Sequence, residues 1–230
     1  MNRQDRSYKS NNEKYTGMEI NMNNNVNWDK LDNDMQRGYS YAKKQDSVSA
    51  CNEWKDVWNT IISIMDENNY NTIEALDKDF NGLQFISNWV SDFEMELDNA
   101  SSVDVSFAQI RIDFCTELLN RVSDRNELNS LNMRRAIAES YYAMGRAEDG
   151  DREFVKLTDE HPTWGWGWIG WSDQYCDYSK NENTNHDRTV EILTKALEIA
   201  GIDEKAEIRN RLEEEYEAYG KYEEAKSIPK

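Results

Sequence analysis

Apolar residues recur at helical intervals along most of this chain, and small residues interrupt them at a fixed spacing. In residues 133–175 the small, aromatic and helix-ending positions follow one another at steps of three, nine, four, three and five: Ala138, Tyr141, Gly150, Phe154, Leu157 and Pro162. Small residues let two antiparallel helices approach closely, and a proline ends a helix because it has no N–H to donate. The spacing therefore predicts a helix, a tight turn and a second helix.

A second helix pair is predicted near the start of the chain. The same steps occur in residues 28–65, at Gly38, Tyr41, Ala50, Trp54 and Val57. Asp46 or Ser47 is expected to cap the second helix, because short polar side chains accept the free N–H groups of a first turn. Asp34 and Arg37 occupy steps at which such a pair usually carries large apolar residues. We interpret this segment as a divergent helix pair.

Residues 66–130 lack this spacing but keep the helical period. One apolar face predicts a helix: Ile86, Trp89, Val90, Phe93 and Leu97. A second apolar face predicts another: Ala108, Ile112, Cys115, Leu119 and Val122. The polar loop 99–104 lies between them. We therefore expect another antiparallel pair, which continues the stack without its usual signature.

The end of the chain repeats the pattern after a polar insertion. Residues 179–187 form a polar loop, and the amphipathic helix 189–200 follows and is ended by Gly201. A last helix pair with an acidic, solvent-facing surface is predicted at Leu212, Tyr216, Gly220, Tyr222 and Ala225. The predicted fold class is all-α: a short α-solenoid of antiparallel helical hairpins over residues 28–230. Residues 1–27, rich in asparagine and poor in aliphatic side chains, are expected to form a disordered arm.

These helix pairs resemble the tetratricopeptide repeat (TPR) family, whose period is 34 residues. Three further stretches narrow the resemblance: A-C-x-x-W-x-x-x-W at 50–58, N-W-x-x-D-F-E-x-E-L at 88–97 and W-G-W-G-W-I-G-W-S-D-Q-Y at 164–175. Together with A-x-A-E-S-Y-Y-x-x-G at 136–145, they are similar to uncharacterised TPR-like domains of Firmicutes that often accompany a SEC-C zinc-binding motif. The resemblance covers roughly residues 39–228 and implies a TPR-like fold. The cysteine-rich SEC-C segment is absent, so its metal or ribosome-linked role does not carry over.

Composition narrows the classes of function. The formal net charge of −18 opposes direct binding of nucleic acid, because a phosphate backbone would be repelled, and it favours a basic protein partner. The three cysteines are odd in number and far apart, which predicts reduced thiols in a cytoplasmic protein. No apolar run approaches the roughly 18 to 20 residues that cross a bilayer, and no signal-peptide core is evident, so no membrane contact is expected.

The sequence offers no set of residues for catalysis. His161 and His186 are the two histidines, and neither belongs to an H-E-x-x-H or Arg-x4-6-His pattern. A glycine-rich phosphate loop, a G-x-S-x-G elbow and a calcium loop are also missing. His161, before Pro162, is expected to cap the end of a helix. We therefore predict a non-enzymatic protein that needs no cofactor and no metal.

The tryptophan-rich stretch supplies the candidate binding site. A shift of 34 residues places Trp168, Trp171 and Tyr175 on inward-facing steps, so these three are expected in the core. The first-helix faces of a TPR-like stack line a concave groove, in which aromatic and charged side chains are the usual anchors. The residues predicted to bind a basic or amphipathic segment of a protein partner there are Arg135, Glu139, Tyr142, Trp164, Trp166, Asp173, Asp177 and Glu214.

An acidic surface supports an alternative function. Residues 66–99 hold nine acidic side chains against the single Lys78. The acidic residues Asp92, Glu94, Glu96 and Asp98 alternate at two-residue steps and are expected to spread around a helix as a solvated face. Such a face can also imitate a phosphate backbone and occupy the basic groove of a nucleic-acid-binding protein, as phage anti-defence inhibitors do. The sequence leaves the partner and the oligomeric state open.

Overall fold

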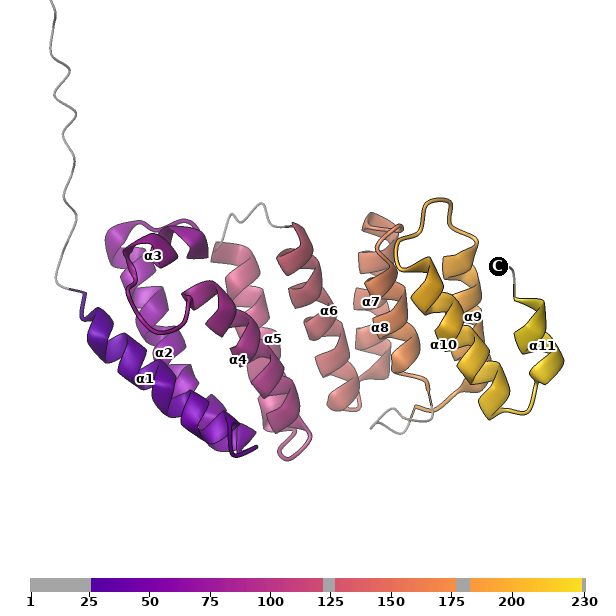
Figure 1. Ribbon diagram of the computed structural model, residues 1–230, viewed down its shortest axis with the longest axis horizontal. Helices are drawn as coiled ribbons and strands as arrows, with labels where there is room; N and C mark the ends of the chain where they lie inside the picture. Colours follow the sequence, from indigo (N-terminus) through magenta and orange to yellow (C-terminus); the bar gives the residue numbers. More distant parts are fainter. Residues whose placement is uncertain (1–25, 122–126, 177–182, 229–230) are drawn as a thin grey trace, which may run out of the picture.

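The fold is a row of antiparallel helix pairs (Figure 1). The computed structural model describes residues 26–121, 127–176 and 183–228, and over these residues it contains eleven α-helices and no strand. The pairs are α1 (Trp28–Ala42) with α2 (Ser47–Asn68), α4 (Ile86–Ser101) with α5 (Ser106–Arg121), α6 (Glu127–Ala143) with α7 (Ala147–Glu160), α8 (Gly165–Asp173) with α9 (His186–Leu197), and α10 (Lys205–Ala218) with α11 (Tyr222–Ser227). The predicted all-α helical-hairpin stack is confirmed. A short helix that the pattern did not predict, α3 (Ile73–Asp79), lies between the first two pairs.

Side chains cap several helices where the sequence places short polar residues. The Asp46 carboxylate accepts the Ser49 N–H at 3.1 Å, so the predicted cap of α2 is confirmed. Asn27 caps α1 by accepting the Lys30 N–H at 3.0 Å. The expected arm therefore ends earlier than residue 27, since this residue belongs to the folded part, and the remainder of the arm lies outside the described residues.

Three turns between paired helices share one geometry. In each turn a backbone N–H reaches back five residues to a helix carbonyl: Asp46 to Tyr41 at 3.1 Å, Arg146 to Tyr141 at 2.8 Å, and Lys221 to Tyr216 at 2.8 Å. The residue before each donor is left-handed: Gln45 has φ 61°, Gly145 has φ 70° and Gly220 has φ 69°. Glycine adopts this conformation without steric cost, and Gln45 adopts it against its usual preference. The shared turn places both helices of each pair side by side.

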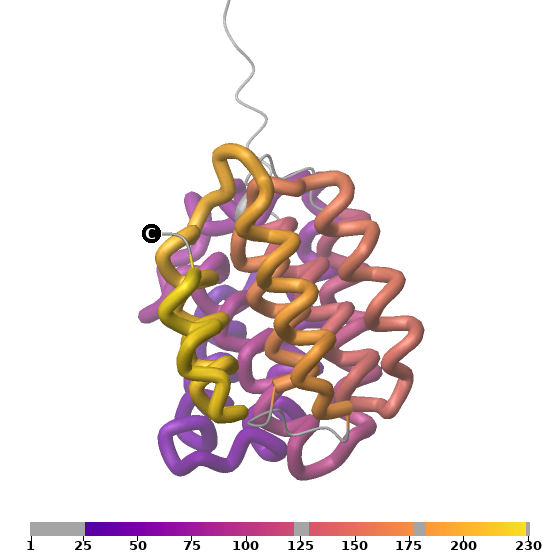
Figure 2. The backbone as a smooth tube through the Cα atoms, turned by 90° about the vertical axis from the view of Figure 1, so that its right-hand side faces the viewer, coloured from indigo at the N-terminus to yellow at the C-terminus, as the bar shows by residue number. Residues whose placement is uncertain are grey.

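The stack has two layers, seen end-on in Figure 2. The helices α4, α6, α8 and α10 pack against one another in succession, in addition to packing against their own partners. Successive helices of the other layer, α5, α7 and α9, are not among the main packed pairs of the described chain. We call α4, α6, α8 and α10, whose successive members touch, the inner layer.

The core consists of two apolar clusters that meet at α6. The first runs from α1 to α6 and is built around Trp54, Trp89 and Phe93, whose rings lie 5.3–6.0 Å apart. The second runs from α6 to α10 and includes three side chains predicted to face inward, Trp168, Trp171 and Tyr175. That prediction is confirmed. Because α6 contributes to both clusters, it connects the two halves of the stack.

Gly38 shows why a small residue recurs at this step. A Cβ atom at Gly38 would lie 2.0 Å from Nε1 of Trp54, a fully buried side chain that donates to the Met35 carbonyl at 3.0 Å. We expect Gly38→Ala to lower the free energy of unfolding by about 2 kcal/mol, because overpacking outweighs the better helix propensity of alanine. Urea unfolding measures the loss. Ser40→Ala, at an exposed position of α1, serves as the control and should change the free energy by no more than about 0.5 kcal/mol; equal stability of both variants would contradict the expectation.

Candidate functional site

The candidate site lies on the inner layer and is centred on α8. Trp166, Gly170 and Asp173 follow one another at steps of four and three, so they share one side of this helix. A Cβ atom at Gly170 would lie 2.7 Å from Cδ of Arg135 and 3.4 Å from Oε1 of Glu139, both on α6. This side of α8 therefore borders α6. We call the surface that carries Arg135, Glu139, Trp166 and Asp173, together with Arg211 and Glu214 of α10, the inner face.

Trp166 is exposed in a chain whose other tryptophans are covered. Its exposed fraction is 37%, whereas the remaining tryptophans, all within the described residues, are buried or half-buried. It lies in the first turn of α8, one helical turn before Gly170. Tryptophan is among the residues that most often anchor a partner at an interface. Trp166 thus has the exposure that a binding residue requires.

A buried arginine connects the inner layer to α5. Arg111 is 6% exposed and pairs with three carboxylates: its Nε donates to Glu94 at 2.6 Å, its Nη1 to Asp98 at 2.8 Å and its Nη2 to Glu139 at 3.0 Å. Burial lowers the pKa of Arg111, but the three carboxylates outweigh this effect and the pKa is raised. The guanidinium therefore stays charged and holds α4 and α6 together. This contact could not be predicted from the sequence, because the four residues are scattered along the chain.

Glu139 and Arg135 lie where the sequence predicted, on the inner side of α6. The Glu139 carboxylate is shared, since it accepts from Arg111 and lies 3.3 Å from Nε of Arg135. Burial raises the pKa of Glu139, and the two arginines oppose this shift in part. Both residues are half-buried and largely engaged with each other. Their charges and shapes form part of the inner face, but each side chain already has a partner within the protein.

The α10 side of the inner face is acidic. Asp173 forms an ion pair with Arg211, and Arg211 also lies 3.6 Å from Glu207. Glu214 is exposed. It lies one turn after Arg211, on the same side of α10 as Glu207 and Arg211. The predicted position of Asp173 and Glu214 on this surface agrees with the structure. Asp177 lies outside the described residues.

Tyr142 and Trp164 are predicted from the sequence to bind a partner, but the structure buries both side chains. Tyr142 is 1% exposed, and its hydroxyl donates to Asp151 at 2.6 Å. Trp164 is 8% exposed and packs over Gly167, whose Cβ position would lie 3.0 Å from its ring. The sequence spacing could not reveal that Asp151 offers the Tyr142 hydroxyl a buried acceptor. Because the Tyr142 hydroxyl has a hydrogen-bond acceptor inside the protein, burial of its aromatic ring away from water is favourable.

Asp151 is the centre of a polar cluster between α6, α7 and α8. Its carboxylate accepts three hydrogen bonds, from the Tyr142 hydroxyl at 2.6 Å, from Nε1 of Trp171 at 2.6 Å and from the Tyr175 hydroxyl at 2.8 Å. Arg188 of α9 lies over the Trp171 ring at 4.9 Å. Burial and the hydrogen bond to Asp151 raise the pKa of Tyr142. This arrangement fixes the three aromatic side chains around one carboxylate.

The four residues of the alternative acidic face have different partners. Glu94 and Asp98 converge on Arg111 instead of spreading around the helix as expected. Asp92 accepts the Tyr39 hydroxyl at 2.6 Å. One oxygen of Glu96, Oε2, is buried without a hydrogen-bond partner among the described residues. The ion pairs with Arg111 partly neutralise Glu94 and Asp98, which reduces the charge available to imitate a phosphate backbone.

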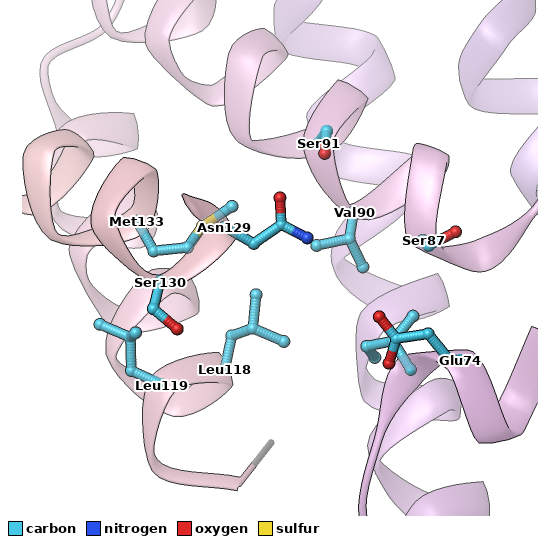
Figure 3. A pocket seen from close by; sticks show the side chains of 10 residues that line it. Glu74, Ser87, Val90, Ser91, Leu118, Leu119, Asn129, Ser130 and Met133 are labelled. Carbon is cyan, nitrogen blue, oxygen red and sulfur yellow. The ribbon is translucent and has the colours of Figure 1, made fainter. Parts of the chain in front are cut away.

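A pocket lies between α3, α4, α5 and α6 (Figure 3). It encloses about 40 Å³ and is lined by Ile73, Glu74, Ser87, Val90, Ser91, Leu118, Leu119, Asn129, Ser130 and Met133. The buried side chains form an apolar floor, and serine, asparagine and glutamate side chains surround it. The volume suits a few water molecules. The sequence did not predict this pocket, because one wall belongs to the unpredicted helix α3.

The histidines have structural contacts. His161 is the C-terminal cap residue of α7, as predicted. Nδ1 of the buried His186 lies 3.0 Å from Oε1 of Glu215, and its ring stacks on Tyr219 at 3.9 Å. Among the residues that the structure describes, no three His, Cys, Asp or Glu side chains gather as a metal ion would require. Within the described helices, none combines the length and the apolar character needed to span a membrane.

Comparison with known proteins adds no family. No model of a known protein family matches the chain, and no curated protein matches it either. The resemblance to TPR-like domains therefore stays a prediction from the residues quoted above.

Proposed function

We propose that this protein is a non-catalytic, TPR-like interaction module of the cytoplasm that binds a basic or amphipathic segment of a protein partner on its inner face. The observation that carries the proposal is the exposure of Trp166. Seven other tryptophans are at least half-buried, so the fold provides ample covered space for such side chains. An aromatic side chain that the fold leaves outside on a packed helix is a typical anchor for a partner.

The charges around Trp166 indicate the chemistry of the partner. Glu214 is exposed on this face, Asp173 shares its charge with Arg211, and the chain as a whole carries a net charge of −18. Cationic side chains are attracted to such a surface, and an arginine or lysine can also stack on the indole ring. Arg111 joins α4 to α6, and α6, α8 and α10 contact one another in succession, so the helices that carry the face are held by the fold before a partner binds. A basic segment that also carries apolar residues suits the acidic charge, the exposed indole ring and the preformed surface.

The proposal is tested with peptides selected from a random library on the full-length protein. We expect the selected sequences to be rich in lysine, arginine and apolar residues. Trp166→Ala should weaken their binding at least about tenfold, because an interface anchor carries much of the binding energy. The free energy of unfolding should change by less than about 1 kcal/mol. Fluorescence titration and urea unfolding give the two quantities.

Tyr222→Ala is the matched control, since Tyr222 is an exposed aromatic residue of α11, away from the inner face. It should leave peptide binding unchanged. Selected peptides without basic residues, or equal binding by both variants, would rule the proposal out. A loss of stability that matches the loss of binding in Trp166→Ala would show that this tryptophan serves the fold alone.

The alternative, a nucleic-acid mimic, predicts a different response to salt. Binding by a mimic depends on many ion pairs and should fall steeply as the salt concentration rises. A contact anchored on Trp166 depends on buried apolar area and should persist. The ion pairs of Glu94 and Asp98 with Arg111 count against the mimic, because they partly neutralise two of its four carboxylates.

A further inference from the structure

A pocket of about 680 Å³ lies at one end of the first two helix pairs. One wall is the turn between α1 and α2, and the other is the end of α4 with the loop that follows it; Figure 1 shows these two segments side by side at the lower edge of the stack. We call this site the turn pocket. It is lined by Ala42, Gln45, Asp46, Ser47, Val48, Glu96, Asn99 and Val103. None of these residues belongs to the inner face, so the turn pocket is a separate site.

Hydrogen bonds hold both walls of the turn pocket. In the first wall the Asp46 N–H donates to the Tyr41 carbonyl at 3.1 Å, and the Asp46 carboxylate caps α2. In the second wall the Val103 N–H donates to the Ala100 carbonyl at 2.9 Å. Because α2 packs against α4, the two walls are also fixed relative to each other. The fold therefore forms the pocket without a ligand, and its volume lies within the roughly 300–1,000 Å³ of small-molecule sites.

The turn pocket contains a carboxylate that lacks a full set of partners. Glu96 is half-buried, and its Oε2 is buried with no hydrogen-bond partner among the described residues. Burial raises the pKa of the Cys51 thiol on α2 to about 12; the charge of Glu96 adds to this shift, and the charge of Lys55 opposes it. Lys55 nevertheless does not donate to Oε2. A buried carboxylate oxygen without a donor is unfavourable, so a ligand that donates to Glu96 gains free energy.

The other lining residues indicate what else the ligand carries. Ala42 and Val48 are half-buried and pack against the core, and Val103 is 78% exposed on the loop. The described residues that line the pocket include no lysine or arginine, and Asp46 supplies a second carboxylate. An aliphatic stem suits the apolar side chains, and a cationic group suits the carboxylates. Among cations, the planar guanidinium donates two parallel hydrogen bonds to one carboxylate.

We propose that the turn pocket binds an aliphatic guanidinium group, with Glu96 as the partner of the cation. The aliphatic stem lies against Val48 and Val103. Asn99 follows Glu96 by three residues, so it lies on the same side of α4 and offers a further acceptor oxygen. The same chemistry is found in a free alkylguanidine and in an arginine side chain of a partner protein, and the experiment separates these two sources. The proposal does not depend on binding at the inner face.

Titration of the full-length protein with butylguanidinium at constant ionic strength tests the proposal. NMR of the backbone amides follows binding, and we expect the largest shifts at Val48, Asn99 and Val103. Glu96→Gln should weaken binding at least about tenfold, because it removes the charge that pairs with the cation but keeps the size of the side chain. Glu67→Gln is the matched control, since Glu67 is exposed near the other end of α2 and the change removes the same charge. It should alter the affinity less than about twofold.

Butylurea is the matched ligand, because it has nearly the same shape as butylguanidinium but no charge. It should bind the parent protein at least about tenfold more weakly. This comparison needs no variant, so it holds even if Glu96→Gln loses stability. Equal binding of the two ligands, or equal weakening in the Glu96 and Glu67 variants, would overturn the proposal. Shifts centred on Trp166 would also overturn it, since they would place the cation on the inner face.

Acetyl-arginine amide distinguishes the two sources of the guanidinium group. An affinity equal to that of butylguanidinium would support an arginine side chain of a partner protein as the ligand, because the pocket would then admit the attached backbone. An affinity at least about tenfold lower would support a free small molecule. Failure of both compounds to bind would overturn the proposal.

Discussion

Replacement of Arg111 by methionine is expected to lower the free energy of unfolding by about 3–5 kcal/mol at neutral pH. Arg111 is the shared partner of Glu94, Asp98 and Glu139, and its own side chain is almost fully covered. Methionine fills much of the same space but carries no charge. Glu94 and Glu139 would then remain half-buried without the cation that compensates them. Asp98 is 55% exposed, so water can solvate its carboxylate.

The loss should depend on pH in a defined direction. Burial already raises the pKa of Glu139 in the native protein, and removing Arg111 takes away one group that opposes this shift. A carboxyl group whose pKa is higher in the folded state stabilises the fold below its unfolded pKa, and this contribution is lost as the pH rises through the folded pKa. The difference between Arg111→Met and the parent protein should therefore be largest near pH 7 and should shrink as the pH falls to about 5.

Urea unfolding of both proteins at several pH values measures this dependence. Arg111→Met combined with Glu139→Gln is the informative second variant, because it also removes one of the unpaired charges. It should recover part of the lost stability at neutral pH. A single variant as stable as the parent, or a loss that grows as the pH falls, would show that the three carboxylates do not depend on Arg111.

Asp151→Ala is the second change with a large expected effect. The Asp151 carboxylate is the common acceptor of the Tyr142 hydroxyl, the Trp171 indole N–H and the Tyr175 hydroxyl. Alanine would leave three covered donors without this acceptor, and each unsatisfied donor costs about 1–3 kcal/mol. We expect a total loss of about 3–5 kcal/mol, since the Tyr142 and Tyr175 hydroxyls lie 3.3 Å apart and partly compensate each other. Thermal and urea unfolding give the value.

Asp149→Ala on the same helix provides the control for this prediction. Asp149 pairs with Arg146 and Arg152 at the surface, and such pairs contribute about 0.5 kcal/mol. The two aspartates are two residues apart, so the comparison separates the buried cluster from general effects on α7. Asp151→Asn should fall between them because the amide keeps one acceptor oxygen. If Asp149→Ala and Asp151→Ala lost equal stability, the cluster around Asp151 would not hold the helices together.

The two polar clusters have a common effect on the candidate site. Arg111 ties α6 to α4 and α5, and Asp151 ties α6 and α7 to α8. The helices that carry Glu139, Trp166 and Asp173 are therefore fixed from both sides. A surface whose helices are already ordered loses little conformational freedom on binding. This rigidity supports the proposed binding of a basic segment, which the exposure of Trp166 carries.

Much of the fold could be predicted from the sequence, because local periodicity determines helices. The apolar face from Ile86 to Leu97 became α4, and Asp46 became the cap of α2, as predicted. The close approach at Gly38 follows from its spacing to Trp54. The helix α9 begins at His186, three residues before the predicted start, since Asn185 accepts the Arg188 N–H and caps it there. The seven-residue helix α3 was missed because so short a segment has no clear period.

The candidate site was only partly predictable. The sequence placed Trp166, Asp173 and Glu139 on the inner side of the stack, and the structure brings them together there. It also placed Tyr142 there, although this side chain is buried against Asp151. Helical spacing tells which residues share a face, but it does not tell whether a neighbouring helix covers that face. That information depends on the register between α6, α7 and α8.

The helices, their turns and the pairing of neighbours follow from the sequence alone, because they depend on residues close along the chain. Which polar groups find partners depends on how the helices pack. Arg111 meets acids from α4 and α6, and Asp151 meets donors from α6 and α8. These contacts join residues 13 to 28 positions apart in the first cluster and 9 to 24 apart in the second. These contacts depend on how helices that are far apart in the sequence align with one another. The same alignment determines which side chains are covered, and it leaves Trp166 exposed on the inner face.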